Sequence, residues 1–122
     1  MTEEEISKEE KTTYVKSLFE CDDDSIYFDR KGKNISLETF VDLMIDQEYR
    51  RVASDNIGDI QVSTVWLGIN HAFYNVEIPI VFETMIFGGK FEEESYMERY
   101  STQEQALEGH KRAVELVKKE LE

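Results

Sequence analysis

Residues 79–87 read Pro-Ile-Val-Phe-Glu-Thr-Met-Ile-Phe, a run made almost entirely of residues that favour β-strands. Pro79 stands at the first position, where its missing N–H does least harm to a sheet. A second strand pattern covers residues 60–70, and a third covers residues 95–100. The connections between these strands are too short for parallel crossovers, which need a dozen or more residues. The sequence therefore predicts an antiparallel meander of three to four strands.

Two amphipathic helices flank the meander. Ser36 is a favourable N-cap, and it precedes apolar residues at helical spacing over residues 37–52. Ser101 to Glu104 has the spacing of a capping box and opens a helix over residues 102–120. Residues 26–28 are a short strand candidate, and residues 54–59 are a connector. The order of these elements predicts an α+β fold, with two or three helices packed against the antiparallel meander.

The length and the charge distribution divide the chain into two parts. Its 122 residues fit one compact domain and are too few for two ordinary ones. The formal net charge is −13, and residues 1–24 carry nine acids against three bases. We expect residues 1–24 to be an acidic N-terminal segment, partly disordered or a frayed helix, and residues 25–122 to be a single α+β domain. Whether Leu121-Glu122 is native stays open.

Composition excludes several classes of function. The strongly negative charge argues against direct binding to nucleic acid or to anionic lipid. No run approaches the roughly 18 consecutive apolar residues of a membrane span, and the acidic N-terminus is unlike a secretory signal peptide. The single cysteine, Cys21, has no partner within the chain for a disulfide. We therefore expect a reducing, cytoplasmic location.

The predicted strands carry apolar residues on both faces of the sheet. One face offers Val62, Trp66, Ile80, Phe82, Ile86, Tyr96 and Tyr100. The other face offers Val65, Leu67, Ile69, Val81, Met85, Phe87 and Met97. Because a sheet with one wet face alternates more cleanly, we expect both faces to be covered. The two helices would cover one face, and the N-terminal helix, a partner subunit or a target protein would cover the other. The candidate interaction residues are Trp66, Leu67, Met85, Phe87 and Met97.

Few residues suggest chemistry. His71, Glu83 and His110 are the types found in metal sites with two histidines and one carboxylate. The favoured alternatives are a histidine at the core edge for His110 and a cross-strand pair with Arg99 for Glu83. Cys21 lies among acids, which disfavour the reactive thiolate. The sequence contains no Gly-x-Ser-x-Gly, phosphate-binding glycine loop or Cys-x-x-Cys motif. It therefore predicts no catalytic residue and no cofactor.

Several motifs occur in a characteristic order. They are Tyr27-Phe28-Asp29-Arg30-x-Gly32, Glu48-Tyr49-Arg50-Arg51-Val52-Ala53, Val62-Ser63-Thr64-Val65-Trp66-Leu67-Gly68, Phe82-Glu83-Thr84-Met85-x-Phe87-Gly88-Gly89, and Arg99-Tyr100-Ser101-Thr102 with Glu108-Gly109-His110. From about Tyr27 to Val117 the chain resembles a family of small proteins encoded by bacteriophages and prophages. The family has no established activity, so the resemblance assigns no catalytic residue. Its members carry a Gly/Pro-rich stretch where this chain has residues 72–77, which leaves any role of that loop open. The resemblance implies a bacterial cytoplasm during infection or lysogeny.

These observations favour a non-enzymatic phage or prophage accessory protein that contacts a host or phage protein, with a homodimer as an open alternative. A second hypothesis is an anti-defence protein that mimics nucleic acid and inhibits a host nuclease or immune complex. Such a mimic needs a dense, rigid array of carboxylates, whereas the acidic clusters lie on a segment predicted to lack rigidity. A third hypothesis is a metal-dependent enzyme or metal-binding module that uses His71, Glu83 and His110.

Overall fold

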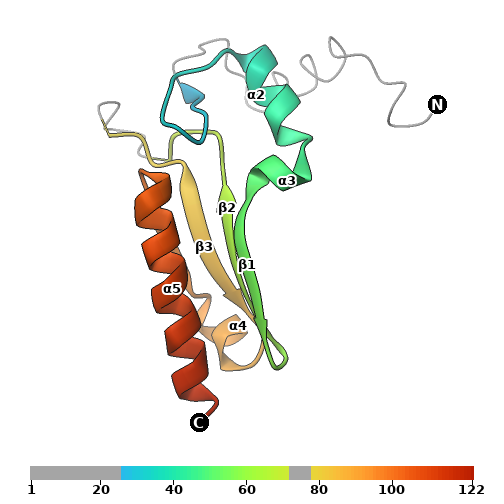
Figure 1. The fold of residues 1–122 in the computed structure, drawn as a ribbon, viewed down its shortest axis with the longest axis vertical. Coiled ribbons are helices and arrows are strands. Elements are labelled where there is room, and N and C mark those ends of the chain that lie inside the picture. The colour runs from blue at the N-terminus through green and yellow to red at the C-terminus, as the bar shows by residue number, and fades with distance from the viewer. Residues whose placement is uncertain (1–25, 72–77) are drawn as a thin grey trace, which may run out of the picture.

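The computed structural model describes residues 26–71 and 78–122, so the predicted N-terminal segment lies outside the described residues. The elements, in chain order, are α2 (Leu37–Met44), α3 (Gln47–Arg50), β1 (Arg51–Ile57), β2 (Ile60–Trp66), β3 (Phe82–Phe87), α4 (Lys90–Glu94), β4 (Met97–Tyr100) and α5 (Gln103–Glu120). The strands form one antiparallel sheet in the order β1-β2-β3-β4. Figure 1 shows α5 running along the sheet, with α2 and α3 gathered at one end. The prediction of an α+β fold is confirmed.

The prediction of one continuous helix over residues 37–52 is wrong, because the helix ends at Met44 and a separate helix covers Gln47–Arg50. Asp46 caps a new short helix, α3, because its carboxylate accepts hydrogen bonds from the backbone N–H groups of Glu48 and Tyr49. From Arg51 onward the chain pairs with β2 as strand β1. Strand β1 therefore includes residues 51 and 52, which were predicted to be helical. It also includes residues 54–57, which are most of the predicted connector.

The other strands lie where the sequence predicts them, although they are shorter. Instead of a strand, residues 26–28 form two isolated bridges, Tyr27 with Ile69 and Phe28 with Asn34. The connection between β3 and β4 contains the short helix α4. Helix α5 is confirmed nearly residue for residue, but its N-cap is Thr102 and its capping box uses Gln105.

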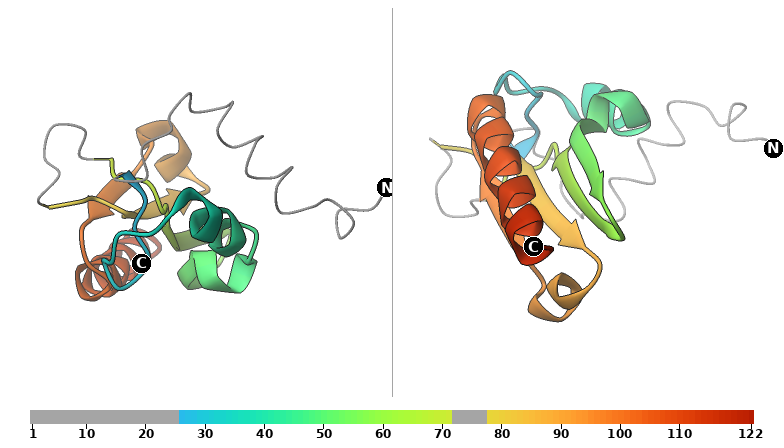
Figure 2. Two further views of the ribbon diagram at one scale, coloured as in Figure 1. Left: turned by 90° about the horizontal axis from the view of Figure 1, so that it is seen from above. Right: turned by 60° about the horizontal axis from the view of Figure 1, so that its bottom comes forward.

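The main core lies between α5 and one face of the sheet, called here the first face. Along β2 and β3 the buried positions alternate with half-buried or exposed ones, as expected when one face of a sheet is covered. Five residues of α5 are buried against this face, namely Ala106, Gly109, His110, Ala113 and Val117. Figure 2 shows α5 in front of the strands from a second direction. Helix α5 thus covers most of the first face.

A second core cluster closes the end of the sheet near α2 and α3. Its buried members are Tyr27, Leu37, Phe40, Val41, Trp66, Val81, Phe82 and Ala106. Trp66 is 1% exposed, and its indole N–H donates a hydrogen bond to the carbonyl of Phe28 at 2.8 Å. Trp66 is therefore a core residue and takes no part in a surface, which corrects its place among the candidate interaction residues.

Candidate functional site

The second face of the sheet lies opposite α5, and its side chains follow from the strand register. Residues directly opposite each other in an antiparallel pair project to the same face. The three rows of this face are Arg51-Val65-Glu83-Arg99, Ser54-Ser63-Met85-Met97 and Asn56-Gln61-Phe87. The half formed by β1 and β2 is largely polar, whereas the half formed by β3 and β4 carries the apolar residues Met85, Met97 and Phe87 next to the Glu83–Arg99 ion pair. The expectation of apolar residues on both faces thus holds for the buried first face, but on the second face it holds only for the part that Met85, Phe87 and Met97 form.

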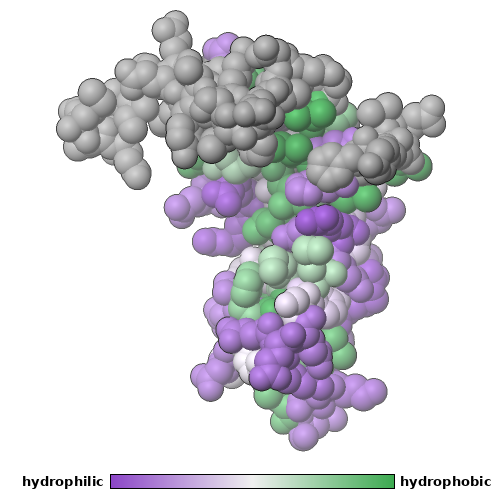
Figure 3. Space-filling model, turned by 180° about the vertical axis from the view of Figure 1, so that it is seen from behind, coloured by the Kyte–Doolittle hydropathy of each residue, from purple (hydrophilic) through white to green (hydrophobic). Residues whose placement is uncertain are grey.

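Three of the candidate interaction residues lie together on this face, and we call Met85, Phe87 and Met97 the β3–β4 patch. Phe87 is 42% exposed and Met97 is 46% exposed, while Met85 is half-buried. Figure 3 views the molecule from behind and shows apolar areas bordered by hydrophilic side chains. Leu67 is half-buried beyond the end of β2, where its N–H donates to the carbonyl of Val81 at 2.7 Å.

The three candidate metal ligands do not form one site. Glu83 belongs to the second face and pairs with Arg99 at 3.0 Å, which confirms the cross-strand pairing. His110 projects from α5 onto the first face, so the sheet separates it from Glu83. Within residues 26–71 and 78–122, no group of three histidine, cysteine or acidic side chains is placed to hold a metal ion.

His110 instead belongs to a buried chain of hydrogen bonds. Its Nε2 lies 2.7 Å from Oδ2 of Asp55, and its Nδ1 lies 2.7 Å from Oγ1 of Thr64. Thr64 in turn bonds to the hydroxyl of Thr84. Because a carboxylate only accepts, Nε2–H donates to Asp55; in the neutral imidazole Nδ1 is then an acceptor, so Thr64 donates to Nδ1 and Thr84 donates to Thr64. The sequence predicted a histidine at the core edge, and the structure gives His110 two side-chain hydrogen bonds.

These hydrogen bonds join an acid, a histidine and a hydroxyl, which is the arrangement of a nucleophilic catalytic triad. Both threonines, however, are 0% exposed. A substrate therefore has no route to either hydroxyl, and the arrangement serves the packing of α5 on the sheet. A sequence signal for this arrangement existed. Thr64 and Thr84 project to the same face as the buried apolar residues of their strands, and a buried hydroxyl needs a hydrogen-bond partner.

His71 lies near the Glu83–Arg99 pair at the end of the second face. Burial lowers the pKa of His71 below its ordinary value, the positive charge of Arg99 lowers it further, and the negative charge of Glu83 raises it. The two histidines thus sit in unrelated surroundings.

We predict that an NMR titration will give His71 a pKa below 6.5, that Arg99→Gln will raise that pKa and that Glu83→Gln will lower it. Since the unfolded chain takes up this proton at a higher pH than the native protein, the contribution of His71 to stability falls as the pH drops from 6.5 through the native pKa. A His71 pKa that Arg99→Gln leaves unchanged would contradict the placement of these three groups.

Among the described residues, no helix combines the length and the apolar character that crossing a bilayer demands. No protein-family model, curated protein or solved structure matches the chain. The resemblance to the phage and prophage family therefore stays a prediction.

Proposed function

We propose that this chain is a non-enzymatic accessory protein that binds another protein through the β3–β4 patch. The observation that carries the proposal is the exposure of Phe87 and Met97 on the sheet face opposite α5. Aromatic and methionine side chains are enriched at protein interfaces, and methionine adapts to partners of varied shape. On the basis of the resemblance, we place the protein in the cytoplasm of a bacterial host during infection or lysogeny.

A binding role is favoured over an enzymatic one by the state of the polar groups. The hydrogen bonds that connect Asp55, His110, Thr64 and Thr84 are closed to substrates because the two threonine hydroxyls are fully buried. On the second face, the carboxylate of Glu83 is bonded to Arg99. Neither arrangement leaves a nucleophile and its base exposed together.

We infer that the partner is a different protein with a basic rim around an apolar contact. Two copies of a chain of net charge −13 repel each other. Helix α4 connects β3 to β4, the two strands that carry the patch, and it exposes Glu92, Glu93 and Glu94. A basic partner surface would complement these acids and would accelerate association.

Nucleic-acid mimicry is a weaker explanation for the described residues. On α5, exposed acids alternate with bases and form ion pairs with them, as in Lys111–Glu108 and Lys118–Glu115. A mimic needs an array of uncompensated carboxylates with a spacing comparable to that of phosphates. The described helix carries no such array.

Site-specific photo-cross-linking in the host tests this proposal. A benzoylphenylalanine placed at Met97 is expected to capture a partner, whereas the same group at Leu107, an apolar residue of α5 that is 37% exposed, is the matched control. Equal capture at both positions, or no capture at Met97, would refute the patch as the contact. A product consisting of two copies of the chain would refute the inference of a different partner.

A further inference from the structure

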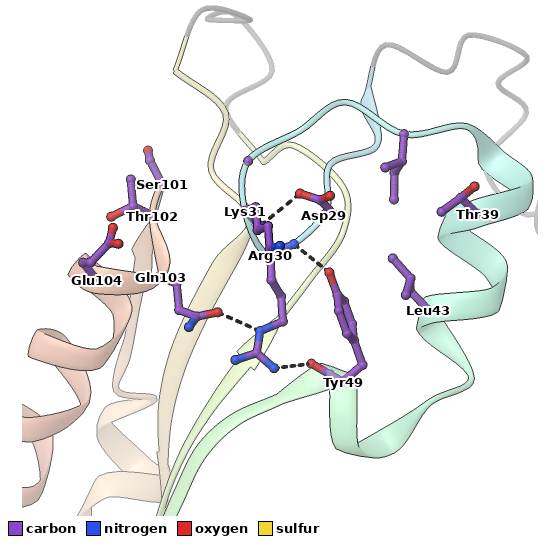
Figure 4. A pocket seen from close by; sticks show the side chains of 12 residues that line it. Asp29, Arg30, Lys31, Thr39, Leu43, Tyr49, Ser101, Thr102, Gln103 and Glu104 are labelled. Atoms are coloured by element: carbon purple, nitrogen blue, oxygen red, sulfur yellow. Dashed lines mark hydrogen bonds between the residues drawn. The ribbon is translucent and has the colours of Figure 1, made fainter.

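A cleft of about 690 Å³ opens between α2 and the first turn of α5 (Figure 4). Its walls come from the turn Asp29–Gly32, from α2, from Tyr49 and from residues 101–104. The apolar part of the wall consists of Ile35, Leu43 and the ring of Tyr49. A volume of this size suits a metabolite, since small-molecule sites measure about 300–1,000 Å³.

Arg30 is held rigidly in this cleft by two other segments of the chain. Its Nε donates to Oε1 of Gln103 at 2.8 Å, and its Nη1 donates to the carbonyl of Tyr49 at 3.1 Å. Its backbone N–H donates to the Tyr49 hydroxyl at 2.8 Å, and its guanidinium lies 5.5 Å from the centre of the same ring. The loss of side-chain freedom that anion binding requires has therefore largely occurred in advance.

The charge of Arg30 is not neutralised by any carboxylate that the structure describes. Both acceptors of its guanidinium are uncharged, namely the Gln103 amide and the Tyr49 carbonyl. The neighbouring Asp29 directs Oδ1 to the backbone N–H groups of Lys31 and Lys33. A half-buried guanidinium with only neutral acceptors is notable in a chain that has 27 acidic residues and 14 basic ones.

Arginine carries five N–H donors in a planar fork, and two of them are used here. Figure 4 shows the second terminal nitrogen directed away from Tyr49, toward the side of α5. An oxyanion is the natural acceptor for such a group because arginine binds carboxylates and phosphates through paired, charge-assisted hydrogen bonds.

We propose that this cleft binds a small molecule that carries a carboxylate or phosphate on an apolar body. The oxyanion accepts hydrogen bonds from Arg30, and the body packs on Ile35, Leu43 and Tyr49. Glu104 also lines the cleft, and its negative charge opposes such a ligand. The cleft and the β3–β4 patch are formed by different residues, so a result that refutes one proposal leaves the other unaffected.

Titration of the labelled protein with three probes, followed through its backbone amide resonances, tests the proposal. Phenyl phosphate and benzoate carry the oxyanion on a ring, and benzyl alcohol carries the ring without the charge. Both anions are expected to shift the amides of residues 30, 49 and 103 and to bind about tenfold more tightly than benzyl alcohol. The tighter of the two anions identifies the class of the natural oxyanion. Equal binding of benzyl alcohol would overturn the proposal.

Variants decide whether Arg30 is responsible. We expect Arg30→Gln to weaken the binding of phenyl phosphate about tenfold, and Arg50→Gln, at an exposed arginine outside the cleft, to leave it unchanged. Glu104→Gln leaves the contacts of Arg30 intact and is expected to tighten binding about twofold. If Arg30→Gln fails to fold, Glu104→Gln still decides, because unchanged or weaker binding in that variant would overturn the proposal.

Discussion

Replacing Gly68 with alanine will lower the free energy of unfolding by roughly 3 kcal/mol, about 1 of which comes from the backbone and the rest from overpacking. Gly68 adopts a φ of +78°, a left-handed conformation that L side chains disfavour. An added Cβ would lie 2.5 Å from Cε1 of Phe40 and 2.8 Å from Cζ2 of Trp66. Both rings are fixed in the core, so neither can move aside.

Gly32→Ala is the matched control for this prediction. Gly32 has a similar φ of +86°, but an added Cβ there meets nothing within 4 Å. We therefore expect Gly32→Ala to lose only the backbone part, about 1 kcal/mol. Urea denaturation of the two variants measures the difference between them. Equal losses in the two variants would show that the rings around Gly68 are packed less tightly than described.

The second large effect is expected at the buried hydroxyls. Thr64→Val keeps the shape of the side chain but leaves Nδ1 of His110 without its donor and Thr84 without its acceptor. An unsatisfied buried polar group costs about 1–3 kcal/mol, so the loss in unfolding free energy is expected in that range or above it. Thr84→Val removes only the outer bond of the chain and is expected to cost less.

Thermal or urea unfolding of both valine variants checks this order. The direction of the hydrogen bonds has a separate readout, because the ¹⁵N shifts of the imidazole distinguish its two tautomers. We expect the proton on Nε2, facing Asp55. A larger loss of unfolding free energy for Thr84→Val than for Thr64→Val, or a proton on Nδ1 alone, would contradict the assigned order of hydrogen bonds.

The sheet and α5 were predictable because local patterns encode them. Alternation along residues 79–87 fixes which side chains share a face, so Met85 and Phe87 were assigned correctly to the second face. The capping-box spacing from Ser101 to Glu104 and the apolar spacing behind it place the start of α5 within one residue, although the N-cap is Thr102. Propensity and tertiary packing agree in these elements.

Strand β1 was missed because two signals competed. The apolar spacing from Leu37 continues through Ile45, which hides the restart at Asp46. The stronger signal was Gly58-Asp59 between Ile57 and Ile60, a two-residue connection typical of a β-hairpin. The polar half of the second face could also have been predicted from the sequence, because Gln61 and Ser63 project to the same face of the strand as Val65.

The Arg30 cleft was beyond sequence reasoning. Arg30, Tyr49 and Gln103 come from three segments that no local pattern joins, and their meeting depends on how α2 and α5 close the end of the sheet. The bonds of His110 to Asp55 and Thr64 likewise depend on the strand register and on the rotation of α5. Such contacts follow from tertiary packing.

Methyl NMR of methionine-labelled protein inside the host tests the central claim most directly. Met85 and Met97 belong to the β3–β4 patch, and the half-buried Met44 of α2 is an internal reference. If the patch binds a partner, the methyl signals of Met85 and Met97 will shift or broaden in the cell relative to the purified protein, while that of Met44 will change less. If all three signals change equally, or if those of Met85 and Met97 match the purified protein, the patch is not a contact surface.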